Sequence, residues 1–367
     1  MILMNRAFLY AYLQFNLGDD LFVKHLIEKY PNVKFYILAD SKYKKIFRKN
    51  KNLIVISNSV YKIKIFNKIK GKLIYFVKKK CSSVIFIGGS IFMEYPEWKN
   101  IINWYKEMSK DKNCYIIGAN FGPYYSDEYY LACKKYFSTI NDICFRDKWS
   151  YNLFKDCNNV RYAPDILFDF DISNYLCNNM EKKAVISIID CSSRNNNPNK
   201  LSTYHEQYIE SILKIMSILN KNNFKITLLA FCTKEFDDKT IKNLLLRLND
   251  DIKKNVSYHF YDGLNLDIIL HEIVTSSYII GTRFHSIILG AVLKKPILPI
   301  VYSNKTINLL NDFNFSGNTI NIMDLGKMEI NENFIMNNYL QDKTILTNEI
   351  IMINARNHFE KLNELYK

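Results

Sequence analysis

Short apolar runs that are almost free of charge recur along this chain, and a polar, periodic stretch follows nearly every one of them. Runs such as "VKFYILAD", "NLIVIS", "SVIFIGGS" and "CYIIGANFGP" are rich in Ile, Val, Phe and Tyr and end in Gly, Asn, Asp or Ser. This composition predicts strands, and strands that are apolar along their length belong in parallel sheets covered on both faces. The alternation therefore predicts an α/β fold of doubly wound, Rossmann-like type.

The alternation pauses once, and this pause predicts two domains. Charge and Asn accumulate over 165–183 without a clear period, and a second series begins at 183. In that second series the pattern predicts helices near 204–221, 237–249, 265–275 and 284–293. A chain of 367 residues also suits two cores better than one. We predict an N-terminal domain over 1–170, a C-terminal domain over 180–330, and an amphipathic helix over 340–367.

The charge and the apolar pattern limit the partners that we expect. The formal net charge is +14, but only 8 of the 50 basic residues are Arg, the residue that base and phosphate recognition favour. No nucleic-acid-binding signature occurs, so we expect no specific nucleic-acid partner. No run is long enough to span a membrane, and the N-terminus resembles a first strand rather than a signal peptide. We therefore expect a cytoplasmic protein and leave open a peripheral contact of its Lys-rich surface with the inner face of the membrane.

The cysteines predict no metal site. None of the eight is paired as C-x-x-C, and several sit inside apolar runs, as reduced, buried thiols do. No Cys/His pair has the spacing of zinc ligands, and no carboxylate cluster of metal-ligand type occurs. We expect neither a metal nor a resident cofactor. The cysteines are Cys81, Cys114, Cys133, Cys144, Cys157, Cys177, Cys191 and Cys232.

Ligands of parallel sheets bind beyond the carboxyl ends of the strands, so the polar residues at those ends matter most. Asn16, Gly18 and Asp19 follow the first predicted strand, and Asp19 is placed to cap the next helix. Gly88 and Gly89 follow a later strand, where two glycines let a ligand approach backbone N–H groups. The alternative for each stretch is an ordinary capped turn.

Two further strand ends in the first domain carry polar residues. "IIGANFGP" supplies Asn120, and "ICFRDKWS" supplies Arg146 followed by Asp147. An arginine that points into a cleft offers a planar fork for a carboxylate or phosphate. A structural ion pair between Arg146 and Asp147 is an equally good interpretation.

In the second domain, "YIIGTRFHSIILG" places Gly281, Arg283 and His285 where a strand gives way to a helix. "PIVYSNK" ends the next strand with Lys305. A helix N-terminus favours an anion, and several buried cations are costly unless something negative joins them. These residues predict an anion site, although a lone histidine is more often structural.

Several of these stretches, taken in order, resemble the polysaccharide pyruvyltransferase family over nearly the whole chain. The matching stretches are "NLGDD" (16–20), "GGS" (88–90), "GANFGP" (118–123), "RDKWS" (146–150), "PD" (164–165), "GTRFHSIILGA" (281–291) and "PILPIVYSNK" (296–305). The chain departs from the family in one place, because Lys294 and Lys295 precede Pro296 where a Gly is common. The resemblance implies a two-domain fold like that of the GT-B glycosyltransferases. It implies transfer of the enolpyruvyl group of phosphoenolpyruvate, a co-substrate, to a sugar of a cell-surface polysaccharide or of its lipid-linked precursor. The products are a pyruvate ketal and phosphate.

The resemblance makes Arg146, His285 and Lys305 the donor-site residues, with Gly281 and Arg283 in the same motif as the histidine. His285 suits the general acid, because an imidazole exchanges protons near neutral pH. Asp19 or Asp165 is placed to orient or deprotonate the acceptor hydroxyl. The residues expected on the acceptor side are Asn16, Gly18, Asp19, Gly88, Gly89, Asn120 and Asp165. The alternative is a GT-B glycosyltransferase that uses a nucleotide sugar, although "YSNK" offers no Glu for a ribose.

Overall fold

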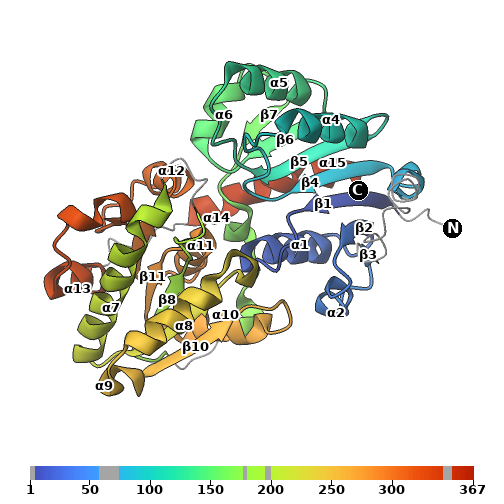
Figure 1. Ribbon diagram of the computed structural model, residues 1–367. Helices are drawn as coiled ribbons and strands as arrows, with labels where there is room; N and C mark the ends of the chain where they lie inside the picture. The colour runs from blue at the N-terminus through green and yellow to red at the C-terminus, as the bar shows by residue number, and fades with distance from the viewer. Residues whose placement is uncertain (1–4, 58–73, 177–179, 195–199, 342–348) are drawn as a thin grey trace, which may run out of the picture. The chain divides into compact units, whose positions relative to one another are not determined.

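The computed structural model describes residues 5–57, 74–176, 180–194, 200–341 and 349–367 (Figure 1). The chain forms two compact units. The first unit comprises residues 1–13, 19–170 and 350–367, and the second comprises 14–18 and 171–349. The division between Phe170 and Asp171 falls inside the stretch where the periodic pattern pauses. Two short segments belong to a unit from which they are separated in the sequence. Residues 14–18 belong to the second unit, and residues 350–367 belong to the first.

The first unit is built on a parallel sheet with the strand order β3-β2-β1-β4-β5-β6-β7. Ala7 of β1 lies opposite Phe35 of β2 on one side and Ser83 of β4 on the other. Because all these strands run the same way, their carboxyl ends meet at one edge of the sheet. The strands are β1 (Arg6–Ala11), β2 (Lys34–Ala39), β3 (Leu53–Ser57), β4 (Ser83–Ile87), β5 (Asn113–Ala119), β6 (Asp142–Phe145) and β7 (Val160–Tyr162).

Helices cover both faces of this sheet (Figure 1). On one face, α4 (Trp98–Ser109), α5 (Asp127–Phe137) and α6 (Lys148–Phe154) bury a core rich in aromatic rings. Phe137 of α5 packs edge to face against Phe92 and Phe154, with ring centroids 4.9 Å apart in each pair. The first βα connection enters α1 (Leu17–Lys29), and the short α2 (Tyr43–Ile46) lies between β2 and β3.

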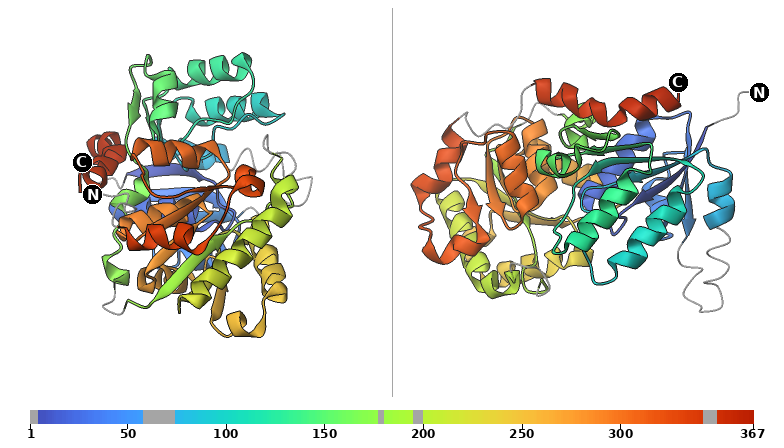
Figure 2. Two further views of the ribbon diagram at one scale, coloured as in Figure 1. Left: turned by 90° about the vertical axis from the view of Figure 1, so that its left-hand side faces the viewer. Right: turned by 90° about the horizontal axis from the view of Figure 1, so that it is seen from above.

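The end of the chain packs against the first unit. The amphipathic pattern predicted one helix over 340–367. The structure instead has α13 (Glu332–Leu340), then α14 (Glu349–Ala355), a 3₁₀ turn η9 (Arg356–Phe359) and α15 (Glu360–Leu365), and residues 342–348 lie outside the described part. Tyr30 of α1 donates a hydrogen bond to Asn363 (2.7 Å), and Ser83 of β4 is hydrogen-bonded to Tyr366 (2.7 Å). Figure 2 shows the last helix, α15, in red, beside the first unit.

The second unit is built on a parallel sheet with the strand order β10-β9-β8-β11-β12-β13. Its central strands, β8, β11 and β12, are buried along their whole length, as near-continuous apolar runs predict. The strands are β8 (Lys183–Ile188), β9 (Lys225–Ala230), β10 (Val256–Phe260), β11 (Tyr278–Gly281), β12 (Ile297–Val301) and β13 (Ile320–Asn321).

The four helices predicted for the second series are present within a residue or two of the expected bounds. They are α7 (His205–Lys221), α8 (Asp237–Arg247), α10 (Leu266–Thr275) and α11 (Phe284–Val292), and α9 (Asp250–Lys253) and α12 (Asn304–Asp312) complete the set that concerns the site. Tyr208, Ile212 and Leu219 of α7 face the sheet at helical spacing and are fully buried. No helix in the described part of the chain is long and apolar enough to cross a membrane. Cys177 lies outside the described residues.

Candidate functional site

Arg146 stands at the carboxyl end of β6 and is almost wholly buried in the first unit. Its Nη1 donates to Oδ2 of Asp165 (3.0 Å), and its Nη2 donates to Oδ1 of Asn120 (2.7 Å). The side chain of Arg146 is 3% exposed and that of Asp165 is 1% exposed, so this is a buried ion pair. Asp165 also caps a 3₁₀ turn by accepting from the backbone N–H of Leu167 (3.0 Å). The sequence placed Arg146 among the donor residues and Asn120 and Asp165 among the acceptor residues, and the structure brings these three side chains together.

Gly89 lies directly beneath the guanidinium of Arg146. A Cβ on this glycine would stand 2.3 to 2.5 Å from three guanidinium atoms, which is closer than atoms can approach. The glycine therefore makes room for the arginine side chain, whereas the sequence suggested room for a ligand. Its neighbour Gly88 lies beside Asp19, whose Oδ1 would be 3.9 Å from a Cβ at that position.

Asp147 is not the ion-pair partner of Arg146 in this structure. Its carboxylate caps α6, accepting from the backbone N–H of Ser150 (2.8 Å) and from the Ser150 hydroxyl (2.8 Å). Consecutive residues at a strand end point in different directions, so Arg146 reaches the more distant Asp165.

The expectation that Asp19 caps α1 is also wrong. The helix begins at Leu17, two residues before Asp19, and the Oδ1 of Asn16 accepts from the backbone N–H of Gly18 (3.1 Å). Residues 14–18 group with the second unit, where Leu17 donates to the carbonyl of Phe231 (3.1 Å) after β9. Asn16 therefore takes the capping position, and Asp19 lies in the first turn of the helix.

His285 packs against Gly18 within the second unit. A Cβ on Gly18 would stand 1.7 Å from the Nδ1 of His285, so only glycine fits under the imidazole. The His285 ring also meets the Phe284 ring edge to face, with 5.3 Å between centroids. The Nζ of Lys305 lies 5.7 Å from the centroid of the same Phe284 ring. The structure thus gathers the histidine and the lysine around one aromatic side chain at the carboxyl edge of the second sheet.

Arg283 is held by carboxylates. Its Nε donates to Asp237 (2.8 Å) and its Nη1 to Glu235 (2.6 Å), and its Nη2 also contacts Asp237. Burial raises the pKa of Glu235, but the guanidinium groups of Arg283 and Arg194 outweigh it and lower that pKa to about 2. These bonds fix the turn between β11 and α11 and leave little of the Arg283 charge for a ligand.

Ser187 of β8 supports the same turn from below. Its Oγ accepts from the backbone N–H groups of Thr282 and Arg283, both at 3.0 Å. A Cβ on Gly281 would stand 2.7 Å from a side-chain carbon of Ile287, so this glycine lets α11 approach the end of β11. Gly281, predicted to bind the donor, serves close packing in the structure.

Three residues that the sequence did not point to extend this cluster: Glu235 binds Arg283, Arg194 binds Glu235, and Asp190 binds Arg194. Arg194 donates to the Asp190 carbonyl (2.9 Å) and to Glu235 (2.5 Å), and its guanidinium carbon lies 5.5 Å from the Tyr302 ring centroid. Asp190 follows β8 and accepts from Ser192 and Ser193. A signal existed, because "IIDCSSR" places Asp, Ser and Arg at the carboxyl end of the first strand of the second series.

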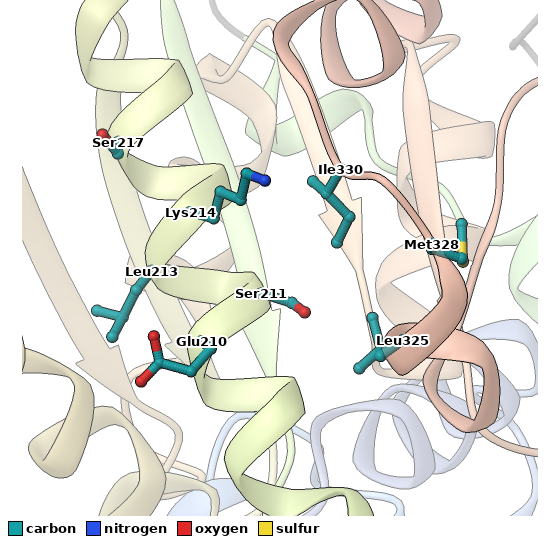
Figure 3. A pocket seen from close by; sticks show the side chains of 8 residues that line it. All are labelled: Glu210, Ser211, Leu213, Lys214, Ser217, Leu325, Met328 and Ile330. Carbon is teal, nitrogen blue, oxygen red and sulfur yellow. The ribbon is translucent and has the colours of Figure 1, made fainter.

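A hollow of about 410 Å³ lies elsewhere in the second unit, between α7 and residues 325–330 (Figure 3). Its lining consists of Glu210, Ser211, Leu213, Lys214, Ser217, Leu325, Met328 and Ile330. None of the predicted site residues lines it, and the chemistry of the strand ends does not extend to it. Among the described residues, no group of three or more His, Cys, Asp or Glu side chains is arranged to hold a metal ion.

The strand-end motifs match a protein family. The model of the family described as polysaccharide pyruvyl transferase matches residues 16–304, which is well over half of the chain. The chain belongs to this family. The match begins at Asn16, includes Arg146 and His285, and ends one residue before Lys305. By sequence, the chain matches no curated protein.

Solved structures show the same fold at low sequence identity. Anabaena Alr3699/HepE, solved with UDP and glucose, is 12% identical with a TM-score of 0.59, and the likeness covers 99% of each chain. Methanocaldococcus jannaschii UDP-GlcNAc 2-epimerase, solved with UDP-GlcNAc and UDP, is 12% identical with a TM-score of 0.59 over 98% of this chain and 99% of that one. A glycosyltransferase from Rickettsia africae is 14% identical with a TM-score of 0.51, over 99% of this chain and 98% of that one. The fold is thus of the GT-B type, as the resemblance implied.

Proposed function

We propose that this protein transfers the enolpyruvyl group of phosphoenolpyruvate to a sugar of a polysaccharide or of its lipid-linked precursor. A proton adds to the methylene carbon, one sugar hydroxyl bonds to C2, and a second hydroxyl displaces phosphate to close a ketal. The two sugar hydroxyls together release two protons. One replaces the proton that was added to the methylene carbon, and the other leaves with the phosphate. The observation that carries the proposal is the family match over residues 16–304, which contains the Arg146 and His285 motifs.

In the second unit, His285 is the proposed general acid and Lys305 the proposed phosphate ligand. His285 is half-buried beside Gly18 and Phe284, which supports a fixed ring orientation. The Lys305 ammonium, over the same Phe284 ring, suits a phosphate as a compact charge on a flexible stem. Arg283 is a positioning residue in this proposal, because all three of its guanidinium nitrogens donate to the two carboxylates of Asp237 and Glu235, whereas Arg146 is paired with a single carboxylate, that of Asp165.

In the first unit, Arg146 is the proposed ligand of the donor carboxylate. Its convergence with His285 and Lys305 on one donor molecule stays a prediction. Asp19 and Asp165 stay the two proposed acceptor-orienting candidates, and Asp165 also accepts hydrogen bonds from Arg146 and Leu167. Asp19 is 9% exposed and lies beside Gly88 at the carboxyl edge of the first sheet.

The proposal is tested by measuring phosphate released from phosphoenolpyruvate with a panel of free and lipid-linked sugars. His285→Ala should lower the rate at least about a hundredfold, the usual scale for the loss of acid–base help. Lys305→Ala should mainly raise the KM for phosphoenolpyruvate. The matched controls are His271→Ala and Lys327→Ala, which remove exposed side chains of the same kinds.

Two results would contradict the proposal. A wild-type rate in His285→Ala would show that His285 is not the general acid. An unchanged KM for phosphoenolpyruvate in Lys305→Ala would show that Lys305 does not bind the phosphate. Turnover of a nucleotide sugar, with no phosphate released from phosphoenolpyruvate, would favour the glycosyltransferase alternative.

A further inference from the structure

Exposed aromatic side chains follow four neighbouring strands of the first sheet. Tyr12 comes directly after β1, Tyr95 lies in the loop after β4, Tyr125 in the loop after β5, and Trp149 in the first turn after β6. Their exposed fractions are 45%, 48%, 63% and 42%. We call these four residues the aromatic row.

The sheet order places the row along one edge. Strands β1, β4, β5 and β6 are consecutive neighbours and run parallel, so all four aromatic residues follow carboxyl ends at the same edge. Neighbouring strands lie about 5 Å apart, and the four strand ends therefore span about 15 Å. That length can hold several sugar rings in a row and is longer than one small molecule.

Hydrogen bonds hold the loops that carry the row. The Glu94 carboxylate accepts from the Ser126 N–H (2.9 Å) and hydroxyl (2.5 Å) and also from the backbone N–H of Tyr125. The backbone N–H of Glu94 donates to the carbonyl of Pro123 (2.9 Å). The loop after β4 is thereby tied to the loop after β5, so Tyr95 and Tyr125 are carried by a braced pair of loops.

Trp149 is seated on the same loop. Its ring would lie 3.7 Å from a Cβ on Gly122, and its centroid is 6.2 Å from that of Tyr124. Asn120, which accepts from Arg146, is the first residue of this loop after β5. The aromatic row is therefore built into the loops that position the proposed acceptor side of the first unit.

We propose that the aromatic row binds the glycan chain of the acceptor, one pyranose ring stacking on each aromatic face, and that it favours extended acceptors over single sugars. The C–H groups on the flat face of a pyranose complement the electron-rich face of an aromatic ring, and tyrosine adds a hydroxyl for the sugar rim. Aromatic residues that follow four adjacent strand ends suit a repeating chain. This inference rests on the proposed function, since it names the substrate of the same edge.

The experiment measures binding without phosphoenolpyruvate, so that it does not depend on turnover. Gluco-, galacto- and chito-oligosaccharides of one to six residues are titrated against the full-length protein by ligand-observed NMR. The wild-type protein should bind at least one series, with an affinity that rises with chain length. Trp149→Ala and Tyr125→Ala should each weaken hexasaccharide binding about tenfold or more and leave the monosaccharide unchanged.

The controls separate stacking from folding. Tyr258→Ala removes an equally exposed tyrosine (49%) from β10 of the second unit and should leave hexasaccharide binding unchanged. Trp149→Phe keeps a flat ring and should retain most of the affinity. Binding that does not depend on chain length, hexasaccharide affinity unchanged in both alanine variants, or no binding of any series would overturn the inference. Row-dependent binding in a protein that releases no phosphate would uphold the inference and contradict only the proposed function.

Discussion

His358 gives the clearest physical test of the first unit. It lies in η9, is fully buried, and its Nε2 donates to the carbonyl of Pro164 (2.8 Å), the residue before Asp165. Its Nδ1 has no hydrogen-bond partner in the described part of the chain. Burial lowers the pKa of His358 to about 3, and the charges of Arg161 and Arg146 act in the same direction.

The sign of the pH effect follows from these values. The unfolded chain takes up a proton near pH 6.5, whereas the folded protein resists protonation until about pH 3. The contribution of His358 to stability is therefore complete above pH 6.5 and is lost progressively as the pH falls toward 3. At pH 5 the loss relative to pH 7.5 is about 2 kcal/mol.

The assay is denaturant unfolding at pH 7.5 and pH 5.0, in the wild-type protein and in His358→Gln. Glutamine can still donate to the Pro164 carbonyl but does not titrate, so the variant should lose about 2 kcal/mol less than the wild-type protein between the two pH values. Other titrating groups cancel in this comparison. His271→Gln, at an exposed position of α10, should behave as the wild type. An equal loss in His358→Gln and wild type would refute the reasoning.

Two further predictions concern the residues around the arginines. Gly89→Ala should lower the free energy of unfolding by about 1–3 kcal/mol, because its Cβ would overlap the Arg146 guanidinium, and should cut phosphate release at least tenfold. Gly326→Ala is its control, since a Cβ there would meet nothing closer than 3.6 Å; equal behaviour of the two variants in unfolding and turnover would contradict the packing argument. Glu235→Gln should lower the free energy of unfolding by about 2–3 kcal/mol at pH 7, because Arg283 and Arg194 lose a shared charge partner. Wild-type stability of that variant in denaturant would show that the two arginines need no such partner.

The arrangement of strands and helices was largely readable from the sequence. Apolar runs such as 183–188 and 297–301 are long enough and uncharged enough to be central strands, and the structure makes them β8 and β12. The sequence did not show where the C-terminal segment packs. An amphipathic face shows that a helix packs, but not against what, and only the folded chain shows His358 and Phe359 buried in the first unit.

Partners of the charged residues were the hardest to predict. Arg146 pairs with Asp165 rather than with the adjacent Asp147, and Arg283 pairs with Asp237, far back in the sequence. Such pairs depend on which strand ends become neighbours in the sheet, and spacing along the chain does not contain that information. The exposed rings of the aromatic row escaped notice for a similar reason, since a sequence rich in Tyr and Phe does not show which rings stay outside the core.

The two glycines beneath His285 and Arg146 show how a strand-end motif acquires its meaning. A glycine at such an end permits close approach, but the approaching group can be a ligand or another side chain of the protein. In both motifs the approaching group is a side chain of the protein. The imidazole of His285 lies over Gly18, and the guanidinium of Arg146 lies over Gly89. Each glycine therefore sets the position of a cationic or proton-carrying group at a sheet edge. Any side chain at either position would move that group before it touched a substrate, so a Cβ at Gly18 or Gly89 should impair transfer even where the fold survives.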